Sequence, residues 1–496
     1  MSTTLSTRHA YYSLPYAVSQ RYFGTRGYVI LRDVAEVFIR AHPEITNETL
    51  AEAARLQPTP DRRMFFPADD KGDADFAIAA FALFGWRIES LYDGWFALYL
   101  AGIVAFCCIY WRHQARLAAL CVATTAIYVT FFALPLTAEL FSIHNPRAFG
   151  IVGLVPIMHL GFAIVDRQRL TVGRLLAAAV QAAIVAFAVH VRSTEWWQVL
   201  AVLAVFVLSL YRPHLRSVAW PVIVLACALA GLEAFQWLSL DREYERTQLR
   251  HRIFWHNIGI GFAVNPELAR KYELDIDDMP MMKLVRRRLV ETNRADELSL
   301  VFMPAGQEDY QFNGIARDYV RYEREARGVV LSILWDNKWA AVKTFLVHKP
   351  RLLAKQLAWA IGYRGYSIDD LYLNGQAKTI ATERDRADRM IYLNFFRPWA
   401  LAGLLVAAWL GGAAGSRRPF LELWGLSLLL CAVSLLPTMA AYPIISNLGP
   451  PLATVSFFVL AGFTWLFARA IAPVTQWTMA AAARRAQPDN GASVAS

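Results

Sequence analysis

The chain has 496 residues, of which 56% are hydrophobic and 18% are charged, and its mean hydropathy is +0.32. This composition excludes an ordinary water-soluble globular protein, which carries more charge. The formal net charge is +10. Because the basic residues fall mostly in short loops and in one long polar block, we expect them to meet anionic lipid or phosphate, and we expect no nucleic-acid partner.

The first 91 residues are polar, and we expect them to form short helices at a membrane surface. Tyr28–Arg40 places apolar side chains on one helical face and charged ones on the other. Ile45–Leu56 begins with Thr46 and Asn47, which suit a helix cap, and it predicts a second short helix. Phe76–Trp86 is apolar but too short to span a bilayer, so it predicts an interfacial helix.

An acidic turn from Asp69 to Phe76 precedes the last of these helices. Its Asp73 and Asp75 are the best catalytic candidates of the chain. A carboxylate beside the membrane can act as a general base toward a hydroxyl group, or it can hold a divalent cation against a phosphate. Aspartate and glycine at a loop-to-helix junction also serve as cap and turn residues, and both interpretations stay open. The divalent cation is optional, and no residue is assigned as a metal ligand.

Nine apolar stretches follow, each long enough for a helix to cross about 30 Å of hydrocarbon. They predict an all-α, polytopic integral membrane protein with about nine transmembrane helices. The predicted spans are 93–111, 117–136, 148–165, 173–191, 196–211, 218–238, 397–414, 420–441 and 448–470.

Short loops rich in lysine and arginine mark the cytoplasmic side of a membrane. Basic and non-basic loops alternate along the chain, with basic loops at 112–116, 167–174, 212–216 and 417–418. The alternation predicts an extracytoplasmic block at 1–91, a six-helix bundle at 92–238, a large extracytoplasmic loop domain at 239–392, a three-helix segment at 393–472 and a cytoplasmic tail at 473–496.

Nine spans place the N-terminus outside, yet residues 1–91 contain no signal peptide and no span that would export them. We expect a further transmembrane helix upstream of this start. An unassisted translocated tail and an error in the span count are the alternatives.

The second polar block opens with basic and aromatic residues where the chain leaves the membrane. Arginine can clamp a phosphate through paired hydrogen bonds, histidine titrates near neutral pH, and a tryptophan ring can stack on a sugar. A basic and aromatic belt that contacts only lipid headgroups is the alternative. The candidate substrate-binding residues are Arg246, Arg250, His251, Arg252, Trp255 and His256.

The later residues of this block are more typical of a protein surface than of a ligand-binding site. The acidic cluster Asp275 to Asp278 lacks the spacing of a calcium loop. Residues 313–327 predict a helix with a basic stripe that suits either a phosphate-bearing lipid or pairing with neighbouring glutamates. Residues 329–362 are amphipathic, with Trp335 and Trp339 beside several lysines, and we expect them to lie along the membrane.

Polar residues inside the predicted spans are few, namely His159, Gln181 and Glu233, with Gln236 near one end. Such groups are costly in a membrane and are often functional. The sequence has no internal repeat and no pair of interrupted spans of the transporter kind. All five cysteines fall within predicted spans, so we expect neither a disulfide framework nor a structural zinc site.

An acidic outer loop ahead of an interfacial helix, many spans and a large late external segment resemble the polytopic GT-C glycosyltransferases, which use polyprenyl-phosphate sugars. The resemblance concerns architecture and covers most of the chain. In that superfamily the first outer loop follows a membrane helix and holds the catalytic aspartate, and by position this role implies Asp73 or Asp75. The chain departs from the pattern because that preceding helix is missing and because Asp73-Ala74-Asp75 replaces a common Asp-Glu pair.

Residues 90–106 and 251–261 also resemble uncharacterised bacterial membrane proteins of envelope-polysaccharide loci. This likeness implies a bacterial cytoplasmic (inner) membrane location. The implied partners are membrane lipid and a polyprenyl-phosphate-linked sugar, and no protein partner is implied. The resulting hypothesis is glycosyl transfer to an extracytoplasmic lipid, glycan or protein acceptor.

Three alternatives remain. An O-antigen ligase or polymerase-like enzyme that acts on a polyprenyl-diphosphate glycan would need the Arg246 to His256 run and not Asp73. A transporter or flippase would depend on Glu233 or His159. A non-catalytic membrane scaffold would tolerate single substitutions at all of these positions.

Overall fold

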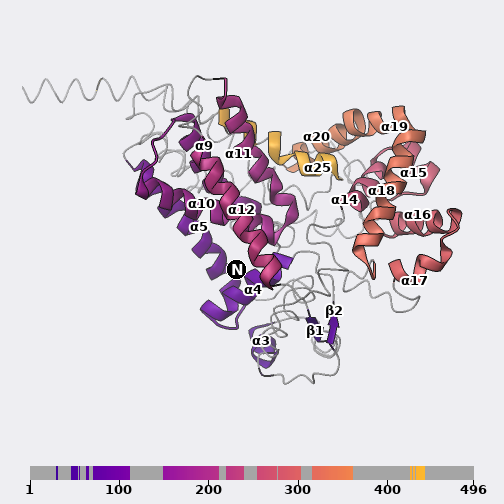
Figure 1. Cartoon of the computed structure of the whole chain (residues 1–496), viewed down its shortest axis with the longest axis horizontal. Coiled ribbons are helices and arrows are strands. Elements are labelled where there is room, and N and C mark those ends of the chain that lie inside the picture. Colours follow the sequence, from indigo (N-terminus) through magenta and orange to yellow (C-terminus); the bar gives the residue numbers. More distant parts are fainter. Residues whose placement is uncertain are drawn as a thin grey trace, which may run out of the picture.

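The computed structural model describes part of the chain. The described residues are 29–31, 46–53, 55, 63–65, 71–111, 149–211, 219–239, 254–275, 278–302, 316–360, 425–426, 428–430, 432–441 and 477. Within them the protein is helical apart from one two-stranded ribbon. The helices form two groups, a membrane-type bundle and a second unit that follows it in the chain (Figure 1).

The ribbon lies near the N-terminus and corrects one prediction. Strand β1 (Val29–Leu31) pairs antiparallel with β2 (Arg63–Phe65), with Ile30 opposite Met64. The prediction of a helix over 28–40 is therefore wrong at residues 29–31. The run Val-Ile-Leu has high β propensity, and a partner strand more than thirty positions away decides its conformation.

Helix α3 (Asn47–Ala53) confirms the short helix expected within 45–56. The side chain of Asn47, however, forms hydrogen bonds with the start of the next long helix. Its Oδ1 accepts a hydrogen bond from the Ile88 backbone N–H at 2.8 Å, and its Nδ2 lies 3.0 Å from Glu89 Oε2. Asn47 thus satisfies a backbone donor at the start of the first long helix.

From Lys71 onward the acidic segment is helix rather than turn. Helix α4 runs Lys71–Phe84, so that Asp73 and Asp75 lie in its first turns, while Asp69 and Asp70 are outside the described residues. Acidic residues at a helix N-terminus are favoured by the exposed N–H groups there. Gly85, with φ of +95°, turns the chain between α4 and the next helix.

Among the described residues before position 240, seven helical elements form what is here called the span bundle. Its elements are α5 (Glu89–Tyr110), α8 (Phe149–Val152), α9 (Leu154–Val165), α10 (Val172–Val191), η5 (Ser193–Glu195), α11 (Trp196–Ser209) and α12 (Trp220–Ser239). Together with α4 they share one apolar core. Since α4 also belongs to this core, the expected interfacial helix is partly packed against the spans.

Three helices of the described residues are long and apolar enough to cross a membrane, namely α5, α10 and α12. They correspond to the spans expected at 93–111, 173–191 and 218–238. The segments at 149–165, 193–209 and 428–440 are shorter apolar helices. The spans expected at 117–136, 397–414 and 448–470 lie outside the described residues.

Hydrogen bonds at the two ends of the bundle show the relative directions of the three long helices. At one end of the bundle, Gln168 Nε2 donates to Tyr110 Oη at 2.7 Å, and Trp220 Nε1 donates to the Gln168 carbonyl at 2.8 Å. At the other end, His190 and Gln236 meet in the last turns of α10 and α12. Helices α10 and α12 are therefore parallel, side by side in Figure 1, and α5 is antiparallel to both.

The second unit, here called the loop unit, spans residues 254–360. Its elements are α14 (Phe254–Ile260), η7 (Gly261–Val264), α15 (Pro266–Tyr272), α16 (Asp278–Glu291), η8 (Ala295–Glu297), α17 (Leu298–Val301), α18 (Tyr319–Asp336), α19 (Lys338–Lys343), η10 (Thr344–His348) and α20 (Lys349–Ala360). Residues of α14 to α19 form a second apolar core. Helix α18 begins later than the helix expected at 313–327, so Arg317 precedes it.

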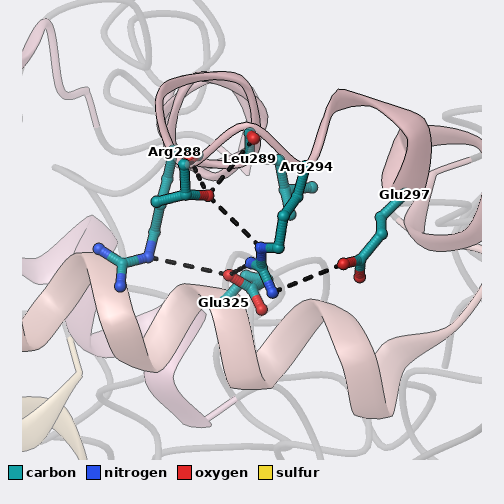
Figure 2. Close-up of polar contacts among 6 residues, drawn as sticks. Arg288, Leu289, Arg294, Glu297 and Glu325 are labelled. Atoms are coloured by element: carbon teal, nitrogen blue, oxygen red, sulfur yellow. Dashed lines mark hydrogen bonds and ion pairs between the residues drawn. The ribbon is translucent and has the colours of Figure 1, made fainter.

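Ion pairs join α16 to α18 at the edge of that core (Figure 2). Figure 2 shows Arg288 and Arg294 both directed at the carboxylate of Glu325, and Arg294 also faces Glu297. The Glu325 side chain is only 10% exposed. The two guanidinium groups offset the cost of keeping this carboxylate nearly buried, and so they help to hold α16 and the segment after it against α18.

The loop unit is attached to the span bundle through α20. Lys349 is fully buried, and its Nζ donates to the carbonyls of Met439 at 3.0 Å and Ala440 at 2.9 Å and also to that of Ala441. These carbonyls lie at the end of α25 (Leu436–Ala440). One turn further on, Leu353 packs into the core of the span bundle.

Candidate functional site

The candidate site is centred on Asp75 and lies where α10 and α12 end. Asp75 Oδ2 is 2.6 Å from His190 Nε2 in the last turn of α10. The side chain of His190 is 2% exposed, whereas that of Asp75 is 32% exposed. The histidine is thus an interior group that holds a carboxylate, and the carboxylate keeps one side open.

A third residue fixes the proton on the imidazole. Gln236 Nε2 lies 2.8 Å from His190 Nδ1. An amide nitrogen only donates, so in this arrangement Nδ1 accepts and Nε2 carries the proton that it donates to Asp75. Asp75, His190 and Gln236 form a continuous hydrogen-bonded chain from α4 through α10 to α12.

The amide of Gln236 also brings a second acceptor to the site. Its Oε1 is buried and has no hydrogen-bond partner among the described residues.

Packing closes the His190 side of the site. Gly72 lies directly against the backbone of His190 and Val191. The rings of Phe187 and Phe235 flank the imidazole, with centroid distances of 6.2 and 6.5 Å. Within the described residues the imidazole of His190 is thus buried, and the partly exposed end of the hydrogen-bonded chain is the carboxylate of Asp75.

The sequence singled out Asp75 but not His190. The signal was available, because His190 and Gln236 each lie in the last turn of a predicted span, on the side to which the acidic loop was assigned. Asp73, the other catalytic candidate, belongs to the same helix, and its side chain is outside the described residues.

The second group of candidates is mostly outside the described residues. Arg246, Arg250, His251 and Arg252 all precede residue 254 and are not described. Trp255 and His256 are described, at the start of α14. The ring of Trp255 is half-buried and lies 5.8 Å from the Arg327 guanidinium.

His256 has a different role from the one the sequence suggested. It is fully buried, its Nδ1 lies 2.6 Å from Tyr322 Oη, and its Nε2 lies 2.9 Å from Asp278 Oδ1. Both ring nitrogens are occupied, so neither is offered to a phosphate. The substrate-binding role expected for His256 does not fit this geometry. Asp278, expected at the surface, has a side chain that is 45% exposed, and it is also the first residue of α16 and a partner of that histidine.

A buried carboxylate orders the same region. Glu323 accepts the backbone N–H groups of Trp255 at 2.7 Å and of His256 at 3.0 Å, and so binds the start of α14. Burial raises the pKa of Glu323, and the two N–H donors oppose that shift. Burial likewise raises the pKa of Tyr322 well above its usual range. His256 and its neighbours therefore act as a structural network.

Polar groups in the middle of the span bundle form a separate set. Gln181 Nε2 donates to the Gly102 carbonyl at 2.7 Å and lies 3.1 Å from His159 Nδ1. Glu233 is half-buried in α12. Among the described residues, no group of three or more His, Cys, Asp or Glu side chains is placed to hold a metal ion.

Comparison with known proteins adds no family: no family model, no curated protein and no solved structure matches this chain.

Proposed function

We propose that this protein transfers a sugar from a polyprenyl-phosphate donor to a hydroxyl group of an extracytoplasmic acceptor, with Asp75 as the general base. The observation that supports the proposal is the chain of Asp75, His190 and Gln236 at the common end of α10 and α12. It supports the proposal because it holds a partly exposed carboxylate at the end of two apolar helices, where a general base for an acceptor hydroxyl is needed.

In the proposed reaction the acceptor hydroxyl gives its proton to the Asp75 carboxylate while its oxygen bonds to the anomeric carbon of the donor. The bond from that carbon to the donor phosphate breaks, and polyprenyl phosphate leaves with the electron pair. His190 donates a hydrogen bond to Asp75 and so orients the base, which makes it a positioning residue. Arginines 246, 250 and 252, with His251, remain the proposed partners of the leaving phosphate.

The test uses the full chain in lipid nanodiscs with fluorescent polyprenyl-phosphate sugars and a panel of soluble and lipid acceptors. Asp75→Asn should lower turnover by about 100-fold or more, the usual share of general base catalysis. The matched control is Asp93→Asn. Asp93 lies near the start of α5 and forms an exposed ion pair with Arg87. This variant should change turnover by less than about twofold.

Two results would overturn the proposal. One is full turnover by Asp75→Asn. The other is a wild-type protein that is well folded but neither binds nor turns over any polyprenyl-phosphate sugar. Turnover of polyprenyl-diphosphate glycans only, with Asp75→Asn unaffected, would indicate the ligase or polymerase-like enzyme instead.

A second candidate is proton-coupled transport, and it is favoured by the polar groups inside the bundle. His159 and Gln181 lie between the Asp75 to Gln236 chain at one end and the Tyr110 to Gln168 pair at the other. A transporter would lose proton uptake into liposomes on His159→Phe. A glycosyltransferase would keep its turnover in that variant, so the two functions are separable in one set of proteins.

A further inference from the structure

The loop unit carries an exposed apolar face that its own core does not use. Nine large apolar side chains of the described loop unit are exposed, and six of them fall within 331–347. Trp335 is 74% exposed, Trp339 is 79% exposed and Leu346 is 72% exposed. The set is Leu331, Trp335, Trp339, Val342, Leu346 and Val347, here called the apolar face. Two exposed tryptophans so close together are unusual in a water-facing unit.

Helical geometry gathers three residues of this set, from α19 and η10, on one side. Trp339, Val342 and Leu346 follow one another at spacings of three and four, which places them on one helical face. The opposite face is buried, since Ala340 and Thr344 accept hydrogen bonds from Asn265 inside the loop unit. The helix is therefore anchored to the loop unit on one side and open on the other.

Cations border the apolar face. Lys338 Nζ lies 4.0 Å from the centre of the Trp335 ring, and Lys343 and Arg351 are exposed nearby. Asp336 is the one exposed carboxylate described between 331 and 351, and its Oδ2 accepts from the Ser332 hydroxyl. Three cations against one anion suit a surface that is negatively charged.

The same helix is continuous with the membrane part of the protein. The apolar face ends at Val347, Lys349 then binds the carbonyls at the end of α25, and Leu353 enters the core of the span bundle. Figure 1 shows α19 and α20 in series, with α20 next to α25. The apolar face therefore ends within two helical turns of Leu353, which is packed against the spans.

From these four observations we infer that the apolar face lies in the boundary between the headgroups and acyl chains of an anionic bilayer. Tryptophan is enriched at this depth because its ring is apolar and its N–H is polar, and lysine next to it reaches the phosphates. The loop unit would be held flat on the membrane rather than free in solution. This inference does not depend on the proposed chemistry at Asp75.

The test measures membrane depth in the full chain. The five native cysteines are replaced by serine or alanine, and single cysteines at Trp339 and Leu346 are spin-labelled in nanodiscs of phosphatidylcholine mixed with phosphatidylglycerol. Collisions with oxygen should exceed those with a water-soluble nickel reagent at both positions. Glu291→Cys, at an exposed position of α16 in the same unit, is the control and should show the reverse.

Further outcomes decide the matter. Water-like accessibility at 339 and 346 overturns the inference, and so does exclusion of both reagents, which would mean that protein covers the face.

Lys338→Gln with Lys343→Gln should make both labels shallower in mixed lipid and leave them unchanged in phosphatidylcholine alone. If the double variant changed label depth equally in the two lipids, the inferred preference for anionic lipid would be refuted.

A second measurement avoids labels at the apolar face. Trp335→Phe with Trp339→Phe should reduce the fraction of tryptophan fluorescence that brominated phosphatidylcholine quenches. An unchanged quenchable fraction in a folded variant would also overturn the inference.

Discussion

A Cβ atom at position 72 would overlap with the backbone of His190, because Gly72 in the first turn of α4 lies directly on the end of α10. This contact brings α4 close enough for Asp75, three positions later, to reach the imidazole. The glycine is therefore a condition for the candidate site, although it carries no chemistry itself.

Gly72→Ala should separate α4 from α10 and break the bond between Asp75 and His190. Overpacking of this kind costs about 1–3 kcal/mol, so we expect a lower apparent Tm together with a loss of turnover. Gly231→Ala in α12 is the control, because a Cβ there meets no atom of the described residues within 4 Å. Wild-type turnover and Tm in Gly72→Ala would show that the contact is not needed.

His190 is expected to act only through Asp75. His190→Leu removes the donor and should lower turnover by about tenfold or more, whereas His190→Gln keeps an N–H donor and should retain part of the activity. In the Asp75→Asn background His190→Leu should have little further effect, since two residues of one unit are not additive. Additive losses in the double variant would contradict a positioning role.

Tyr322→Phe should destabilise the loop unit without affecting lipid binding. The change removes the hydroxyl that pairs with buried His256 Nδ1, and an unsatisfied buried polar atom costs about 1–3 kcal/mol. Thermal unfolding followed by circular dichroism gives the shift in apparent Tm. Tyr211→Phe, at a residue that is 89% exposed, serves as the comparison and should not shift it. A large loss of polyprenyl-phosphate affinity in a folded Tyr322→Phe variant would indicate that His256 takes part in substrate binding.

Lys349 should make stability depend on pH. Burial lowers the pKa of Lys349 from 10.5 to about 7, while the amine keeps its ordinary value in the unfolded chain. Between these two values the unfolded chain binds a proton that the folded protein lacks, so stability rises as pH increases through this window. Below the lower value both states carry the proton, and the dependence ends.

Lys349→Met removes this dependence. The apparent Tm of the wild type minus that of the variant should increase from about pH 7 to about pH 9. The variant also leaves three carbonyls without a donor, which lowers its Tm at every pH and does not alter the slope. Lys338→Met, at an exposed amine, should show no such slope. A difference that is flat with pH would mean that Lys349 is charged throughout.

Three of the nine expected spans could be predicted because they follow from helix length and apolarity. The stretches at 93–111, 173–191 and 218–238 correspond to α5, α10 and α12. The side of the membrane on which each loop lies stays a prediction. Local pattern failed at Val29–Leu31, where pairing with a distant strand overrides a helical periodicity.

The site was predictable only in part. Asp75 stands out as a carboxylate ahead of an apolar helix, but its partner is 115 residues away, and no local pattern connects the two. His256 shows the opposite error. In sequence it looks like a ligand in a basic and aromatic run, and only the packing of α14 against α16 and α18 reveals that both of its nitrogens are used internally.

The bond network of Lys349 has a consequence for the order in which the protein is assembled. Its three carbonyl partners lie 90, 91 and 92 residues later in the chain. At about 5–20 residues per second, the ribosome reaches them several seconds after the lysine has been made. Until residues 436–441 have emerged, the amine has none of these acceptors, so the loop unit completes its attachment to the spans late in biogenesis. A truncated chain that ends before residue 436 would leave that attachment unfinished.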